Sequence, residues 1–242
     1  MAYTTLHLST AGGIATLTLD RPEARNALNL AMCEDLKAAA QAVGRDPSAR
    51  LLFIRGKGPS FCAGADLKER VGKNADWVRE RRMKAFAAYD AIEALAIPVI
   101  AVVEGHALGA GVEISSICDF IVATPAASFG TPETMRGSVG ATQRLPRVIG
   151  KRLAKDLMFT GRRLTAEEAK LFGFVSRVVA PSELESELRK ISEAILGASP
   201  DALRLAKRCI DRGVETDQKG AMAIEIEAIE EQLASGKWMG KQ

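Results

Sequence analysis

The chain has 242 residues, of which 47% are hydrophobic and 26% charged, so it is long enough to bury one sizeable core. Its formal net charge of +3 is too small to indicate nucleic-acid binding by itself. No apolar run approaches the roughly 20 residues of a membrane span, and the N-terminal sequence lacks a basic-then-apolar export signal. We therefore expect a cytoplasmic protein that does not enter a membrane.

The cysteines and histidines give no sign of a disulfide framework or a metal site. Cys33, Cys62, Cys118 and Cys209 are far apart and form no C-x-x-C pair. Cys62 has no obvious histidine base beside it, so we interpret it as structural. His106 is interpreted as a loop residue, because no second histidine or cysteine follows at metal-ligand spacing. No bound metal is expected.

The first elements in chain order are a hairpin, a helix and a strand. Polar and apolar residues alternate over 4–9 and 14–19 on either side of two glycines, which predicts a β-hairpin. Asn29 is suited to cap a helix that ends near Gly44. A short buried strand is predicted at 51–54.

Strands then alternate with helices through the middle of the chain. Residues 56–70 form a loop whose small side chains leave the backbone approachable. The helix predicted over 77–95 carries the charged run RERRMK, which we interpret as a solvated face. A buried strand at 98–103, a helix at 110–118 and a strand at 120–123 follow. This order predicts an α/β fold with crossover connections.

The chain changes character near residue 182, where helical patterns replace the alternation. Four apolar residues share one helical face: Leu184, Leu188, Ile191 and Ile195. A second helix starts at Pro200 and a third carries apolar residues near 226–233. We therefore expect an α/β core over 1–181 and a helical region over 182–242 that packs on the core or on a neighbouring subunit.

Three glycine- or proline-containing turns follow or flank buried strands, at 63–66, 109–113 and 131–133. Sites in α/β proteins are built at strand ends. A helix that begins at Ala110 leaves its first amide hydrogens unpaired. If an amide of the first turn converges with them, the two donors could hold a carbonyl oxygen as it becomes an enolate, each contributing on the order of 3 kcal/mol.

Glu113 and Glu133 could form an acid-base pair in the same pocket, because the 20 residues between them allow a helix and a returning strand. Mutual repulsion and burial would then raise one pKa. Structural roles remain open at this point. The glycine-rich turn could serve close packing alone, Glu113 could pair with a basic neighbour, and Glu133 could be a helix-entry acid.

Several motifs in a fixed order resemble the enoyl-CoA hydratase/isomerase family of the crotonase superfamily. They are RPEARNALN (21–29), FCAGADLKER (61–70), GHALGAGVEISSICD (105–119), FGTPE (129–133), the stretch 142–179 and LAKRCIDRG (205–213). The resemblance covers most of the chain. It implies a spiral of strand-strand-helix repeats with a C-terminal helical region, assembled as a homotrimer or homohexamer.

The resemblance also implies the site and the reaction. It assigns two oxyanion-hole amides to Ala65 and Ala110, and a water-activating base and a proton donor to Glu113 and Glu133. The expected enzyme is an enoyl-CoA hydratase, a hydro-lyase that converts a 2-enoyl-CoA thioester to a 3-hydroxyacyl-CoA in fatty-acid or branched-acid catabolism. Coenzyme A belongs to the substrate and no separate cofactor is implied. The residues expected to bind it are Arg25, Ala63, Gly64, Ala65, Asp66, Leu67 and Lys68.

Three alternatives stay open. An enoyl-CoA isomerase of the same fold needs only one well-placed base. FCAGADLKER, the LPR at 145–147 and the segment from 210 also resemble a branch that includes methylglutaconyl-CoA hydratases, some of which bind RNA. The helix after Asn29 has few lysines, so nucleic-acid binding is not expected. A non-catalytic scaffold that binds acyl-CoA or RNA is the third alternative.

Overall fold

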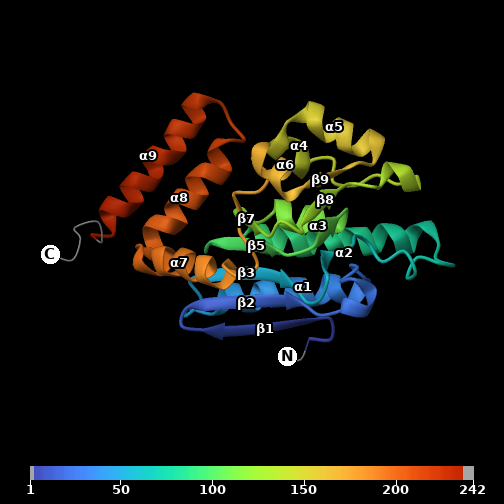
Figure 1. Ribbon diagram of the computed structural model, residues 1–242. Helices are drawn as coiled ribbons and strands as arrows, with labels where there is room; N and C mark the ends of the chain where they lie inside the picture. The colour runs from blue at the N-terminus through green and yellow to red at the C-terminus, as the bar shows by residue number, and fades with distance from the viewer. Residues whose placement is uncertain (1–2, 237–242) are drawn as a thin grey trace.

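Six strands form the larger of two β-sheets in the computed structural model, which describes residues 3–236 (Figure 1). In spatial order they are β1 (Leu6–Ala11), β2 (Ile14–Leu19), β3 (Leu51–Gly56), β5 (Val99–Val103), β7 (Phe120–Ala123) and β10 (Arg177–Val178). Strands β1 and β2 form the predicted antiparallel hairpin, and every later pairing in this sheet is parallel.

The smaller sheet consists of short strands that the sequence did not predict, and the first of them lies in the stretch 56–70 that was expected to be a loop. They are β4 (Ser60–Cys62), β6 (His106–Leu108), β8 (Ser128–Gly130) and β9 (Arg163–Thr165). The prediction of a loop at His106 was wrong, because His106 belongs to β6 and its Nδ1 lies 2.8 Å from the hydroxyl of Ser128. Along the chain, the pairs β3 and β4, β5 and β6, and β7 and β8 each place their first strand in the larger sheet and their second in the smaller one. This repeat confirms the expected spiral of strand-strand-helix repeats.

Nine α-helices and two 3₁₀ turns complete residues 3–236. The helices are α1 (Leu30–Arg45), α2 (Ala75–Glu93), α3 (Ala110–Ser116), α4 (Arg144–Ile149), α5 (Lys151–Thr160), α6 (Ala166–Leu171), α7 (Leu184–Gly197), α8 (Pro200–Gly213) and α9 (Gln218–Ala234), and the turns are η1 (Pro22–Ala24) and η2 (Thr134–Arg136). Asn29 caps α1 as predicted, since its side chain accepts a hydrogen bond from the Met32 amide.

The central strands of the larger sheet are buried on both faces, which explains their uninterrupted apolar sequences. In β3, Leu52 and Ile54 belong to the main hydrophobic cluster, together with side chains of α1 and α2. Leu51 and Phe53 point to the opposite face, where they pack against apolar residues of α7, including Leu188. Helix α7 is therefore the cover of the second face of the sheet, while a domain boundary at residue 181 stays a prediction.

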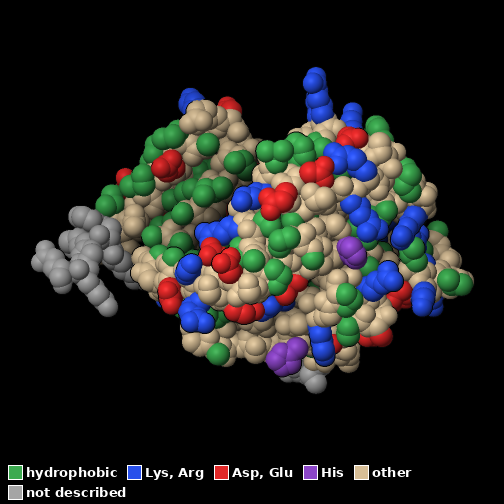
Figure 2. All heavy atoms as spheres, viewed as in Figure 1, with side chains coloured by type: hydrophobic (Ala, Val, Ile, Leu, Met, Phe, Trp, Pro, Cys, Tyr) green, Lys and Arg blue, Asp and Glu red, His purple; other side chains and the backbone are tan. Residues whose placement is uncertain are grey.

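Helices α8 and α9 pack against each other as an antiparallel pair that stands apart from the sheets (Figure 1). The pair is tied to the core by Lys207, whose Nζ lies 2.8 Å from the Asp119 carboxylate. Hydrophobic side chains gather along the pair beside a hollow in the surface (Figure 2), and among those exposed are Ile210, Ile226 and Ile229. Residues 237–242 of the predicted helical region lie outside the described part of the chain.

No helix among residues 3–236 combines the length and apolar composition that a membrane span requires. Cys33, Cys62 and Cys118 are buried free thiols, and burial raises the pKa of each of them. Desolvation raises the pKa of Cys62 to about 11, so its thiol stays protonated and unreactive near neutral pH. This agrees with the structural role predicted for it.

Candidate active site

A cavity of about 380 Å³ lies among α2, the turn before α3 and the segment after β8. The structure brings four residues singled out from the sequence to its wall, namely Ala65, Ala110, Glu113 and Glu133. They come from three separate loops or turns, each at the end of a strand of the smaller sheet. The same edge of one sheet therefore supplies both carboxyl groups and both candidate amides.

The loop that contains Ala65 is fastened by backbone hydrogen bonds to the segment before α1. The Leu28 amide donates to the Gly64 carbonyl over 2.8 Å, and the Asp66 amide donates to the Leu28 carbonyl over 2.9 Å. These bonds flank Ala65, whose own amide donates to no residue within 3–236. The Ala65 N–H group is thus held in a fixed place and remains available to a ligand.

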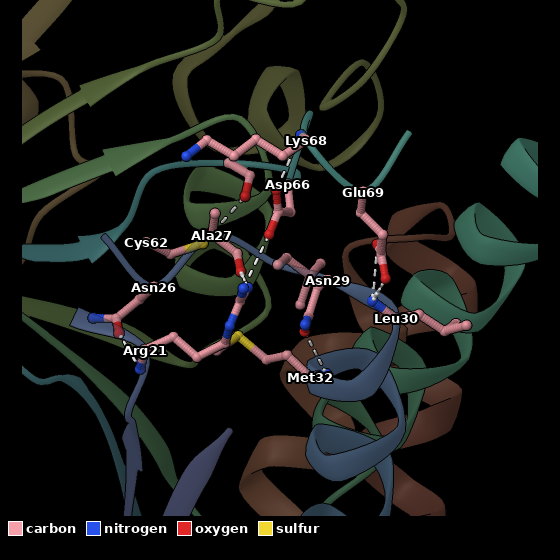
Figure 3. A network of polar contacts seen from close by, with 12 residues as sticks. Arg21, Asn26, Ala27, Asn29, Leu30, Met32, Cys62, Asp66, Lys68 and Glu69 are labelled. Atoms are coloured by element: carbon pink, nitrogen blue, oxygen red, sulfur yellow. Dashed lines mark hydrogen bonds and ion pairs between the residues drawn. The ribbon is translucent and has the colours of Figure 1, made fainter. Parts of the chain in front are cut away.

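Side chains reinforce this connection (Figure 3). Arg21 donates to the Ala27 carbonyl and forms an ion pair with Asp66 at 3.0 Å. Asn26 is fully buried in a left-handed conformation, with φ 54°, and its side chain joins the Arg21 amide to the Ser60 carbonyl. The motif RPEARN therefore acts as a brace for the loop at the cavity.

Glycines let the turn before α3 approach both the Ala65 loop and Glu133. Gly109 has φ +51°, and a Cβ at this position would lie 3.7 Å from the Gly64 Cα and collide with Glu133 Oε1. A Cβ at Gly111 would collide with the Cys62 carbonyl. Because Ala110 is the first residue of α3, its amide has no partner in the helix, and none elsewhere within the described chain.

The carboxyl group of Glu113 is mostly buried but has partners for its charge. Its Oε1 accepts a hydrogen bond from the Ala141 amide at 3.3 Å. Burial is the dominant influence and raises the pKa of Glu113, while the Ala141 amide and the positive charges of Arg144, Arg82 and Arg81 oppose the rise. These groups favour the ionised form that a general base requires.

Glu133 has a different environment. Its Oε2 is buried and receives no hydrogen bond from any residue of the described chain. Burial raises the pKa of Glu133, and the negative charge of Glu113 raises it further, while a hydrogen bond from its own backbone amide and the charges of Arg136 and Arg82 oppose the rise. The two carboxyl groups are therefore unlike, and Glu133 is the better suited of the two to hold a proton.

The residues expected to bind coenzyme A divide into two groups. Backbone and side-chain atoms of Ala63, Gly64, Ala65 and Leu67 line the cavity, whereas Arg25, Asp66 and Lys68 do not. The Asp66 carboxylate is already engaged by Arg21 and by the Lys68 amide. Asp66 thus serves the internal bracing of the loop.

Two basic residues of α2 face the cavity, and the interpretation of RERRMK as a solvated face was wrong for both. Arg81 is only 7% exposed, donates to the Leu28 carbonyl and lies 3.6 Å from the Glu69 carboxylate. Arg82 is half-buried and lines the cavity. The sequence did contain a signal for this position. Arg81 and Arg82 are three or four residues from Val78 and Ala85, which also line the cavity, and residues at this spacing share a helical face.

Within residues 3–236 the structure contains no group of three or more histidine, cysteine or acidic side chains arranged to hold a metal ion. What the cavity does provide is a pair of unlike carboxyl groups and two free amides beside glycine-rich turns. These groups can move protons and stabilise an oxyanion.

Comparisons with known proteins agree with this fold and site. The sequence model for the family described as enoyl-CoA hydratase/isomerase matches residues 9–239, and the chain therefore belongs to this family. The chain is 42% identical over 224 residues to the putative enoyl-CoA hydratase/isomerase YngF of Bacillus subtilis, covering 91% of this chain and 86% of that protein. It is 41% identical to the crotonyl-CoA hydratase of Syntrophomonas wolfei, covering 95% and 90% of the two chains.

The same relationship holds for solved structures. The crystal structure of an enoyl-CoA hydratase from Bacillus anthracis superposes with a TM-score of 0.90 at 38% identity, covering 94% of this chain and 90% of that chain. The crotonase fold expected from the sequence is thus confirmed, as is the family assignment.

Proposed function

We propose that this protein is an enoyl-CoA hydratase that adds water across the 2,3 double bond of a 2-enoyl-CoA thioester. The observation that carries the proposal is the presence of two unlike glutamates, Glu113 and Glu133, in one cavity. The family and the names of its relatives support hydratase activity and hydro-lyase chemistry, and the isomerase alternative is not favoured.

In this mechanism the amides of Ala65 and Ala110 form an oxyanion hole for the thioester carbonyl. As electrons move from the double bond toward this oxygen, an enolate develops, and donors fixed beforehand stabilise it without reorganising. Both amides lack internal partners within residues 3–236, which supports their assignment. The thioester itself is the electron sink, so the proposed reaction uses no metal and no redox cofactor.

The two glutamates then divide the proton transfers. Glu113 removes a proton from water as the oxygen attacks Cβ, and protonated Glu133 delivers its proton to Cα of the enolate. The product is a 3-hydroxyacyl-CoA, with Glu113 protonated and Glu133 ionised. Proton exchange with solvent restores the starting state. The partners of Glu113 and the unpartnered Oε2 of Glu133 favour this division over the reverse.

Coenzyme A would be held by Arg25 and by the loop from Ala63 to Lys68. The loop has an approachable backbone, and the basic side chains suit the several negative charges of the coenzyme. Since Asp66 is already paired with Arg21, its contribution would come through its backbone position. The proposed partner is therefore an acyl-CoA thioester.

The protein would work as a homotrimer or homohexamer. The exposed apolar side chains of α8 and α9, which include Ile226 and Leu233, would be covered in such an assembly. A cytoplasmic location fits the buried free thiols, because reducing compartments keep cysteines unpaired. We place the reaction in the catabolism of fatty or branched-chain acids.

The test is hydration of crotonyl-CoA, followed as loss of the ultraviolet absorbance of the conjugated thioester, with the product identified by mass. The expected product is heavier by one water. Glu113→Gln and Glu133→Gln should each lower kcat on the order of 10³-fold, because each removes one proton-transfer group. Glu104→Gln is the control, since Glu104 lies outside the cavity and pairs with Arg55.

The alternatives have their own outcomes. Conversion of a 3-enoyl-CoA to the 2-enoyl isomer, with no addition of water and with one glutamate dispensable, would identify an isomerase. Binding of coenzyme A or RNA without turnover, unaffected by either glutamine substitution, would identify a non-catalytic scaffold.

A further inference from the structure

The segment from Glu133 to Ala141 controls both carboxyl groups of the site. Glu133 stands at its start, and at its end the Ala141 amide donates to Glu113. Between them the segment is mostly exposed, and Ala141 adopts φ 54°, a conformation that L-residues rarely occupy. A segment with little burial needs specific tethers if it is to keep two groups in place.

One such tether comes from α2. Nη2 of Arg82 donates to the hydroxyl of Ser138 over 3.1 Å. The Ser138 amide in turn donates to the carbonyl of Glu133 over 2.9 Å. A continuous chain of hydrogen bonds therefore runs from α2 through Ser138 to the backbone of Glu133.

Arg82 is notable for the partners it lacks. Its neighbour Arg81 lies close to the Glu69 carboxylate, but no carboxylate within residues 3–236 lies at ion-pair distance from Arg82. A half-buried guanidinium on a cavity wall carries a desolvation cost that an ion pair would normally offset. The position of this cation is therefore not explained by a structural salt bridge.

We propose that Arg82 is a positioning residue for the hydration reaction: its guanidinium holds Ser138, and through Ser138 the segment that carries Glu133, against α2. This inference rests on the proposed function, since it assigns Arg82 a part in the proton transfers of Glu113 and Glu133. Arg82 acts through these groups and touches no reacting atom.

The charge of Arg82 adds a second, separable effect. Arg82 lowers the pKa of both Glu113 and Glu133, against the larger effect of burial. The other ionisable groups that face the pair are Arg81 and Tyr89 of α2, Arg136 of η2 and Arg144 of α4. Removing the Arg82 charge should therefore raise the pKa of both glutamates, whereas removing only its hydrogen bond should not.

Three variants separate these effects in crotonyl-CoA hydration. Ser138→Ala removes the acceptor and keeps the charge, so kcat should fall by roughly tenfold with an unchanged pH profile, the fall expected for one charged hydrogen bond. Arg82→Gln should lower kcat at least as much and shift both limbs of the profile to higher pH, because both carboxylates lose a nearby cation. Arg82→Lys should restore the pH profile and recover only part of kcat.

Hydrogen-deuterium exchange supplies a readout that does not depend on turnover. Peptides spanning 133–141 should exchange faster in Ser138→Ala and in Arg82→Gln than in the unaltered protein, because the segment loses its tether. Arg79→Gln is the matched control on the same helix. Arg79 is exposed and pairs with Asp76, so its substitution should change neither exchange nor the pH profile.

Two results would overturn the inference. A rise in KM with kcat and the pH profile unchanged in Arg82→Gln would mean that Arg82 binds the substrate directly. Unchanged exchange over 133–141 in both variants would mean that no tether exists. If the unaltered protein fails to hydrate crotonyl-CoA, the proposed function fails, while the exchange experiment still decides whether Arg82 holds the segment.

Discussion

The turn that carries Glu113 and the segment that carries Glu133 are built in opposite ways. Glu113 belongs to α3, whose first turn packs so closely on β4 that a Cβ at Gly111 would strike the Cys62 carbonyl. Glu133 begins a mostly exposed segment held by single hydrogen bonds, one of them from Arg82. The base is therefore positioned by the core, and the acid by a few polar contacts of the exposed segment that follows it.

Because of this difference, substitutions in the two regions should affect stability and activity to different extents. Substitutions in the α3 turn should disturb folding and catalysis together, because the turn is part of the packed core. Substitutions in the segment 133–141 should disturb catalysis with much smaller effects on the free energy of unfolding.

The largest expected effect is on stability. Gly111→Ala should lower the free energy of unfolding by about 3 kcal/mol, because its Cβ meets a backbone carbonyl that has little freedom to move. Gly137→Ala is the matched variant in the other region: no atom lies within 4 Å of the added Cβ, and its φ of +63° should cost about 1 kcal/mol. Urea unfolding measures both, and equal losses would contradict the proposed difference between the regions.

The second prediction concerns the contact between the two regions. Gly109→Ala places a Cβ against Oε1 of Glu133, so the carboxyl group must move. We expect kcat to fall about 100-fold, because a displacement near 1 Å can cost this much in a positioned group. The crotonyl-CoA assay measures it, and Gly72→Ala, at a glycine with open space and φ +73°, is the control. Full activity in Gly109→Ala would show that Glu133 is not held where the structure has it.

The smallest expected effect is a pH dependence of stability. Burial and the Glu113 charge raise the pKa of Glu133 in the folded state above the ordinary value of 4.5. The folded state then binds the proton more tightly than the unfolded chain, so stability declines as pH rises through the folded pKa. Glu133→Gln removes this loss.

The thermal unfolding midpoint of Glu133→Gln should therefore be higher than that of the unaltered protein at about pH 8. The difference should shrink toward about pH 4, where Glu133 is mostly protonated in both the folded and the unfolded protein. The reverse trend, a variant less stable at high pH, would mean that the ionised carboxylate of Glu133 is stabilised in the folded protein.

Local sequence signals predicted much of the fold. The hairpin β1–β2 follows from alternation around two glycines, and α1 from a capping asparagine and an apolar stripe. The meeting of Glu113 and Glu133 at one cavity followed from the rule that sites form at strand ends. These inferences depend only on short-range pattern and on known connection geometry.

The smaller sheet could not be predicted in the same way. Strands β4 and β6 have three residues each, too few to show a period, and their partners lie far along the chain. Arg82 was misread for a related reason. A charged run on a helix is usually solvated, and only the packing of α2 against the segment after β8 reveals that Arg82 faces a cavity.

The family resemblance had a different limit. A motif match assigns a role to a residue from its position in the motif. It cannot show whether the side chain of that residue already binds another group within the protein. Asp66 illustrates this, because its carboxylate is paired with Arg21 and takes no part in lining the cavity.

The strands of the smaller sheet, β4, β6, β8 and β9, lie side by side in the order in which they occur along the chain, and all six strands of the larger sheet follow the same rule. During synthesis each new strand can therefore join an edge that already exists, and no strand must insert between two formed neighbours. The segment from Glu133 to Ala141 emerges after β8, when the α3 turn and its glutamate are already in place. On this order of assembly the base reaches the site before the proton donor, and a chain that stalled between them would hold Glu113 without Glu133.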